Sequence, residues 1–119
     1  MSPSNPARMG VGVISAGRVG AVLGNALRAA GHQVTGVVAR SDASRERADV
    51  LLPGAPILTP DEVIERSELV ILAVPDDELA PLASSLAKRG IVPGAQIIVH
   101  TSGRYGIEVL RPLEEAGAI

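Results

Sequence analysis

Residues 13–20 read Val-Ile-Ser-Ala-Gly-Arg-Val-Gly, and they join a short apolar run to an amphipathic stretch. The run at 9–14 has the length and composition of a strand that is buried on both faces. Residues 18–30 carry apolar side chains at helical spacing. A strand that turns sharply into a helix points the first helical amides at one spot, where they favour an anion. Residues 13–20 therefore predict a phosphate-binding turn.

Small residues give this turn the pattern Ser-x-Gly-x-x-Gly. Gly17 allows a diphosphate to approach the backbone closely, and Gly20 allows the helix to pack closely on the strand. Ser15 stands where such turns usually have their first glycine, and its hydroxyl either donates to a phosphate or narrows the turn. A turn without a ligand is the alternative. The predicted cofactor-binding residues of the turn are Ser15, Ala16, Gly17, Arg18, Val19 and Gly20.

Strand-like and helix-like segments alternate along the rest of the chain. Further strands are expected at 33–39, 56–58, 69–74 and 96–100, and further helices at 41–52, from 60 onward, at 76–89 and at 106–115. Because parallel strands need crossover connections, this alternation predicts an α/β fold: a Rossmann-like, doubly wound parallel sheet with helices on both faces. We expect one domain at 9–119, preceded by a flexible tail at 1–8.

Local signals mark several of the helix ends. Gly31 is placed to cap the end of the first helix, and Ser41 to cap the start of the second. Residues 59–62, Thr-Pro-Asp-Glu, combine a capping hydroxyl, a proline in the first helical position and a glutamate that completes a capping box. Asp76 and Asp77 put negative charge at the positive end of the next helix.

The composition excludes several classes of function. The 119 residues are 46% hydrophobic and 20% charged, which suits a compact globule and not a disordered chain. A net charge of −2 and a lone aromatic residue argue against nucleic-acid binding. The absence of cysteine excludes disulfides and thiolate metal sites, and no metal site is predicted. No apolar run is long enough to cross a bilayer, so we expect a cytoplasmic protein without a membrane partner.

The end of the second expected strand indicates which dinucleotide would bind. A fold of this type that binds NAD has an acidic residue here, about 20 residues after the turn, for the ribose hydroxyls. This chain has Arg40 and Ser41 instead, a guanidinium and a hydroxyl that suit the 2′-phosphate of NADP(H). The alternatives are a solvated arginine and a serine that only caps the helix. The missing acid also disfavours an S-adenosylmethionine methyltransferase.

Two further strand ends should face the nicotinamide, since ligands of doubly wound sheets bind at the carboxyl ends of the strands. Val74, Pro75 and Asp76 follow one strand and are predicted to bind the cofactor, although Asp76 also suits a helix start. His100 and Ser102 follow the next strand and are the candidates for contact with a substrate carbonyl. The alternative for His100 is a hydrogen bond to neighbouring backbone. His32 lies at the opposite end of the sheet and is expected to be structural.

These motifs together resemble the 6-phosphogluconate/β-hydroxyacid dehydrogenase-like superfamily, and within it the ketopantoate-reductase-like proteins. The resemblance rests on residues 11–20, 39–41, 72–77 and 100–103 and covers nearly the whole chain. It implies NADP(H) binding and reduction of a small oxo acid or imine. It also implies a helical C-terminal domain, which carries the catalytic lysine and the dimer interface and is missing from these 119 residues. No residue here, Lys88 included, matches that lysine, so the chain alone is expected to be inactive.

Other functions remain compatible with the sequence. One is a nucleotide-sensing or degenerate Rossmann module that acts through a partner protein, and another is the cofactor domain of a deazaflavin-dependent reductase. Ser15 favours the first, and the segment 100–103 favours an enzyme. An exposed apolar edge at the C-terminal side of the sheet would also promote association, so a homodimer, or association through this edge, is expected.

Overall fold

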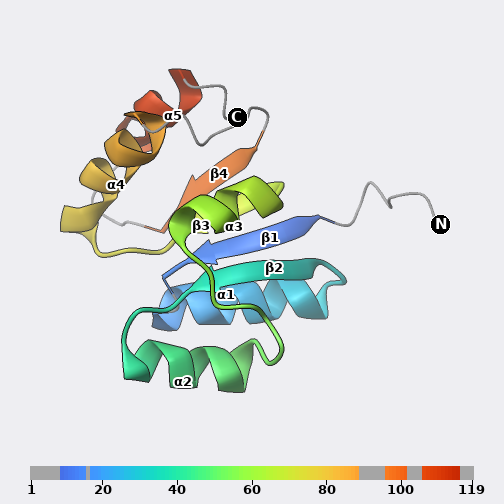
Figure 1. Cartoon of the computed structure of the whole chain (residues 1–119). Coiled ribbons are helices and arrows are strands. Elements are labelled where there is room, and N and C mark those ends of the chain that lie inside the picture. The colour runs from blue at the N-terminus through green and yellow to red at the C-terminus, as the bar shows by residue number, and fades with distance from the viewer. Residues whose placement is uncertain (1–8, 16, 89–95, 102–105, 116–119) are drawn as a thin grey trace.

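The computed structural model describes residues 9–15, 17–88, 96–101 and 106–115, and its strands form one parallel sheet (Figure 1). The strand order is β2-β1-β3-β4. The bounds are Gly10–Ile14 for β1, Gln33–Val38 for β2, Leu69–Leu72 for β3 and Ile97–His100 for β4. The chain leaves β1 toward one side and then returns to build the other side, so the order reverses between β1 and β3. This reversal is the switch point at which sheets of this type bind ligands.

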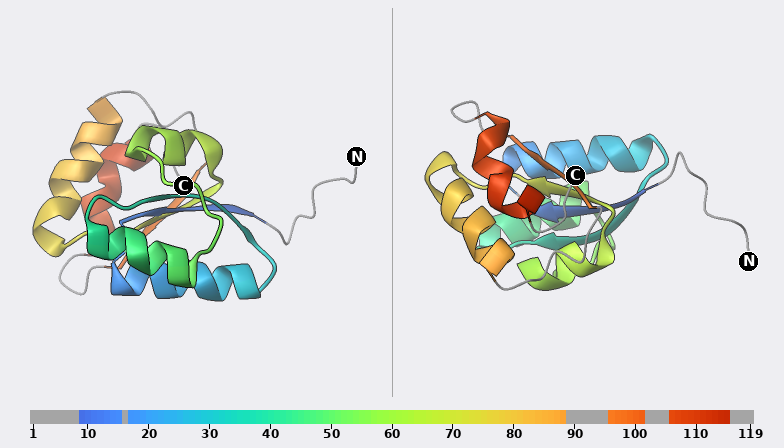
Figure 2. Two further views of the ribbon diagram at one scale, coloured as in Figure 1. Left: turned by 60° about the horizontal axis from the view of Figure 1, so that its bottom comes forward. Right: turned by 90° about the horizontal axis from the view of Figure 1, so that it is seen from above.

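Helices cover both faces of the sheet (Figure 2). On one face lie α1 and α2, and on the other lie α3, α4, the 3-10 helix η1 and α5. Their bounds are Arg18–Ala29, Asp42–Leu51, Pro60–Arg66, Asp76–Lys88, Ile107–Leu110 and Arg111–Glu115 in that order. The predicted doubly wound α/β fold is therefore confirmed. No helix in the described part of the chain is long and apolar enough to cross a membrane.

Two hydrophobic clusters, one on each face, hold the helices to the sheet. The larger cluster packs Leu79 and Leu86 of α4 and Leu113 of α5 against strand residues such as Leu72. The smaller one packs α2 against β1 and β2, for example through Leu52 and Val13. Each of these side chains is almost fully buried. Burial of one such aliphatic side chain stabilises a fold by about 1.5–3 kcal/mol, so the sheet is held from both sides.

The helix ends follow the local signals in the sequence. Gly31 has a φ of +101°, and its N–H donates to the Arg28 carbonyl at 3.0 Å. The N–H of His32 donates to the Leu27 carbonyl at 3.0 Å, which completes a Schellman motif. The side chain of Ser41 accepts a hydrogen bond from the Ser44 N–H at the start of α2, as expected.

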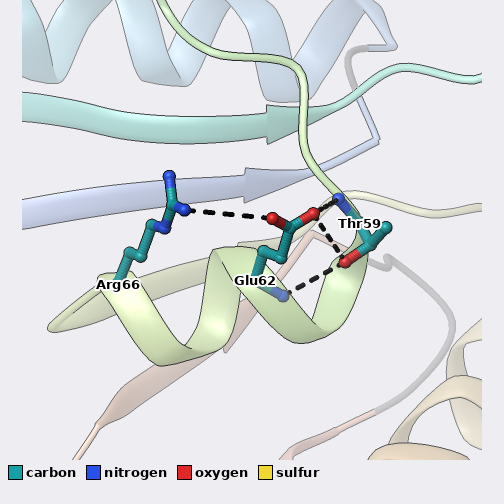
Figure 3. Close-up of polar contacts among 3 residues, drawn as sticks. All are labelled: Thr59, Glu62 and Arg66. Atoms are coloured by element: carbon teal, nitrogen blue, oxygen red, sulfur yellow. Dashed lines mark hydrogen bonds and ion pairs between the residues drawn. The ribbon is translucent and has the colours of Figure 1, made fainter.

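The start of α3 is a complete capping box (Figure 3). The Glu62 N–H donates to Thr59 Oγ1 at 3.3 Å, while Thr59 N and Oγ1 both donate to Glu62 Oε1 at 3.1 Å. Hydrogen bonds from the Thr59 backbone and hydroxyl, with Arg66 nearby, lower the pKa of Glu62 below its usual value of 4.5. The predicted helix-start signature at 59–62 is confirmed.

The predicted strand at 56–58 is wrong. Within this segment only Ile57 forms a β-bridge, and its partner is Val37. The Val37 N–H donates to the Pro56 carbonyl, and the Leu58 N–H donates to the Val37 carbonyl. A turn with Gly54 at φ +81° precedes the segment and the Thr59 cap follows it, so no longer ladder has room to form. The expected helix at 106–115 also differs, since it begins as the 3-10 helix η1 and becomes α-helical only in α5.

Candidate functional site

The carboxyl ends of the strands lie in one row across the sheet. The strand pairing aligns Val38 with Ile14, Ile14 with Leu72, and Leu72 with His100. The segments that follow these residues therefore leave the sheet along the same edge. The turn after β1, the end of β2 and the start of α4 all belong to that edge.

A cleft of about 350 Å³ opens at this edge, between the turn, the end of β2 and the start of α4. Many of the residues predicted for the cofactor line it. Ser15 and Gly17 come from the turn after β1, and Arg40 and Ser41 from the end of β2. Val74 and Pro75 come from the segment that leads into α4. The structure thus brings together, in one cleft, segments that are up to 60 residues apart in sequence.

The turn has an open side and a closed side. Among the described residues away from its own chain neighbours, the nearest atom to a Cβ on Gly17 would be Ser15 Oγ, at 3.8 Å, so the backbone of Gly17 is open where it lines the cleft. A Cβ on Gly20 would lie 2.5 Å from the Ser15 carbonyl oxygen and 2.9 Å from Ala73 Cβ. Gly17 therefore leaves room for a ligand, whereas Gly20 lets α1 pack on the sheet.

Ser15 has a left-handed backbone, with a φ of +80°. This conformation explains why turns of this kind usually have glycine at the position: an L-residue is strained there by about 1–2 kcal/mol. The turn forms in spite of the serine. Gly17 then begins α1 as its N-cap, and its carbonyl accepts the first helical hydrogen bond, from Ala21, at 2.9 Å. The positive end of a 12-residue helix thus borders the cleft.

Some predicted residues do not line the cleft. Arg18 and Val19 are exposed on the first turn of α1, and Asp76 begins α4. Ala16 and Ser102 lie outside the described residues.

The end of β2 carries more positive charge than the sequence motif indicated. Ser44 and Arg47 of α2 line the cleft together with Arg40 and Ser41, and sequence reasoning missed both. The signal was available, because Ser41, Ser44 and Arg47 are spaced by three residues and so share one helix face. Two guanidinium groups and one carboxylate, that of Glu78, are the charged groups among the cleft residues.

The hydroxyls at this end of the cleft already have partners. Ser41 Oγ accepts from the Ser44 N–H and donates to Ser44 Oγ, each at 3.0 Å, while Ser44 Oγ donates to the Ser41 carbonyl at 2.9 Å. Both serines therefore hold the start of α2. Arg40 and Arg47 carry the positive charge at this end of the cleft, and their guanidinium groups are the stronger candidates to bind an anion.

The two histidines lie at opposite ends of the sheet. His100 Nε2 lies 3.0 Å from the Gly106 carbonyl oxygen, and His100 is not among the cleft residues. Because a carbonyl only accepts, Nε2 is the protonated nitrogen in this contact. The N–H of Met9 donates to His32 Nδ1 at 3.0 Å, so His32 joins the start of β1 to the start of β2 as a structural residue.

Comparisons with known proteins agree with this arrangement. The profile of the Rossmann-like domain matches residues 2–119. The chain belongs to the Rossmann-like domain family. No curated protein matches its sequence significantly.

Several solved structures share the fold. A candidate NADP oxidoreductase from Bacteroides fragilis is 26% identical, with a TM-score of 0.71 over 87% of this chain and 39% of its own. An imine reductase from Bacillus cereus is 24% identical, with a TM-score of 0.67 over 93% of this chain and 38% of its own. A 3-hydroxyisobutyrate dehydrogenase from Mycobacterium tuberculosis is 17% identical, with a TM-score of 0.73 over 94% and 38%. The chain thus spans less than half the length of these neighbours.

Proposed function

We propose that the chain binds NADP(H) in this cleft and forms the nucleotide-binding part of an oxidoreductase. The observation that carries the proposal is the pair of guanidinium groups, Arg40 and Arg47, on the same cleft as the bare backbone of Gly17. Arginine binds phosphate through charge-assisted, often bidentate, hydrogen bonds. The 2′-phosphate distinguishes NADPH from NADH, so this end of the cleft favours NADPH.

The residues present fit such a ligand from end to end. The diphosphate would lie against Gly17 at the start of α1, and the 2′-phosphate would face Arg40 and Arg47. Val74 and Pro75 border the side on which the nicotinamide ribose would lie. When bound, the cofactor supplies a hydride; the residues of this chain bind it and hold it in place.

The proposed substrate is a small oxo acid or imine, in an enzyme similar to ketopantoate reductase. Two structural neighbours, an imine reductase and a 3-hydroxyisobutyrate dehydrogenase, support this chemistry. Those neighbours are more than twice as long as this chain, so catalytic groups from additional sequence are part of the proposal. A longer form with a second domain that binds NADPH but reduces neither oxo acids nor imines would contradict the substrate class.

Calorimetric titration with NADPH and with NADH tests the cofactor. A hydrogen bond to a charged group contributes about 1.5–3 kcal/mol, so Arg40→Gln should weaken NADPH binding by roughly tenfold to a hundredfold. NADH binding should weaken much less, because NADH has no 2′-phosphate. Arg66→Gln is the matched control, because Arg66 is exposed at the other end of the sheet. Equal affinity of the unmodified chain for the two cofactors would overturn the NADP assignment.

A second candidate is a nucleotide-sensing module that acts through a partner protein. The contact between His100 and the Gly106 carbonyl favours it, because the imidazole is engaged with neighbouring backbone and lies outside the cleft lining. NADPH binding by a longer form that oxidises no NADPH with any oxo acid or imine would favour this candidate over the reductase.

A further inference from the structure

The cofactor cleft continues into a second cavity. This cavity, of about 630 Å³, lies between the start of α3 and the first turns of α4. Four residues line both spaces and so form the passage between them: Arg40, Pro60, Glu78 and Leu82. The passage is next to the end of β2, which is where the adenosine half of a dinucleotide would lie if the proposed function holds.

The walls of the passage have the chemistry of a purine site. Pro60 and Leu82 are apolar and partly buried, so they offer surfaces against which a flat ring can pack. The guanidinium of Arg40 is planar and stacks on aromatic faces. These groups bind the faces of any purine equally well, and they leave its edge to be read by a polar group.

Glu78 is that polar group. It lies in the first turn of α4, where its N–H donates to the Pro75 carbonyl at 2.9 Å. Within the described part of the chain, its carboxylate has no hydrogen-bond or ion-pair partner. Arg40 lines the same passage but forms no ion pair with Glu78 in the described part of the chain. The carboxylate oxygens of Glu78 are therefore available to a ligand. A carboxylate only accepts hydrogen bonds, so it prefers a ring edge that donates.

We propose that Glu78 accepts a hydrogen bond from the exocyclic amino group of adenine and thereby selects adenine over purines with a carbonyl at that position. The inference rests on the proposed NADP(H) site and adds a base-reading residue to it. A purine with a carbonyl oxygen there directs an acceptor at the carboxylate, and its nearest donor, the ring N1–H, points in another direction.

The test compares NADPH with its hypoxanthine analogue, in which a carbonyl oxygen replaces the adenine amino group. The quantity measured is the dissociation constant of the analogue divided by that of NADPH. A change of charge near the phosphates affects both ligands alike, so it cancels in this ratio. In the unmodified chain the analogue should bind at least about tenfold more weakly, as expected when a polar group is left facing an unmatched ligand. In Glu78→Gln the ratio should fall to about one or below, because the amide can donate to the carbonyl oxygen.

Asp77→Asn is the matched control. Asp77 lies one residue away on the same helix turn and lines the second cavity, but it does not line the passage. Its loss removes the same charge and should leave the ratio unchanged. A role of Glu78 limited to the start of the helix would alter stability and not this ratio.

The outcomes separate the inference from the function on which it rests. NADPH binding with a ratio near one in the unmodified chain, or with a ratio that Glu78→Gln does not change, overturns base reading and leaves the NADP(H) site standing. Failure of the unmodified chain to bind either ligand overturns both.

Discussion

The close approach of α1 to the sheet at Gly20 makes a sharp prediction for Gly20→Ala. The new Cβ would lie 2.5 Å from the Ser15 carbonyl oxygen, 2.9 Å from Ala73 Cβ and 3.1 Å from Val13 Cγ1. Ser15 belongs to the turn after β1, and Ala73 to the segment after β3. Neither segment can move without disturbing the sheet. The helix and the turn must therefore shift.

The expected size follows from two opposing effects. Overpacking of a close-packed site destabilises a protein by about 1–3 kcal/mol or more. Alanine favours the helix over glycine by about 0.8–1 kcal/mol, which offsets part of that loss. A contact of 2.5 Å with a backbone oxygen belongs to the upper part of the overpacking range. We therefore expect the free energy of unfolding to fall by about 1–2 kcal/mol, which corresponds to a decrease of roughly 0.5–1 M in the urea midpoint.

Gly24→Ala is the matched control in the same helix. A Cβ at Gly24 would meet the two Leu52 methyl groups at 3.1 and 3.2 Å and Val13 Cγ2 at 3.2 Å. The ends of a leucine side chain can give by a few tenths of an ångström, so the helix preference of alanine should cancel the strain to within about 0.5 kcal/mol. Urea unfolding at 25 °C, followed by circular dichroism, measures both variants. A Gly20→Ala variant as stable as Gly24→Ala would refute the reasoning.

Two further predictions concern the turn and α3. Ser15→Gly relieves the strain of a φ of +80° in the folded chain but gives the unfolded chain more conformational freedom. The free energy of unfolding should therefore rise by about 0.5–1 kcal/mol, seen as a higher melting temperature. No rise, or a rise equal to that of Ser15→Ala, would contradict this prediction. Hydrogen bonds from the Thr59 backbone and hydroxyl lower the pKa of Glu62 in the folded state below 4.5. Glu62 therefore stabilises the fold above its unfolded pKa, and this contribution is lost as the pH falls from about 4.5 through the lower folded pKa. Glu62→Gln should therefore lose more stability at pH 7 than at pH 3, measured by urea unfolding with Glu65→Gln as the control. A loss of stability that is independent of pH would count against the capping contact.

The fold and many of the helix ends were predictable because their signals are local. The Schellman motif at Gly31, the caps at Ser41 and Thr59 and the turn at 15–20 each depend on residues within a few positions of one another. The alternation of strands and helices then requires parallel pairing. The strand predicted at 56–58 failed because its length was set by its flanking turn and cap and not by its own apolar residues.

The cleft depends on packing between distant segments. Arg47 and Glu78 belong to helices whose sequence patterns show an exposed face but not what that face borders. Only the packing of α2 and α4 on opposite faces of the sheet places these two residues across one cleft.

The sequence by itself determined a glycine-containing turn between β1 and α1, a parallel sheet and a basic residue after β2. Tertiary structure decided that Ser41 and Ser44 are engaged in capping, that His100 contacts backbone, and that Arg40 and Glu78 stand at one passage. The physical reason is the separation in sequence of the residues that interact. Caps and turns form between neighbours along the chain, whereas a cleft forms where the ends of separate strands meet.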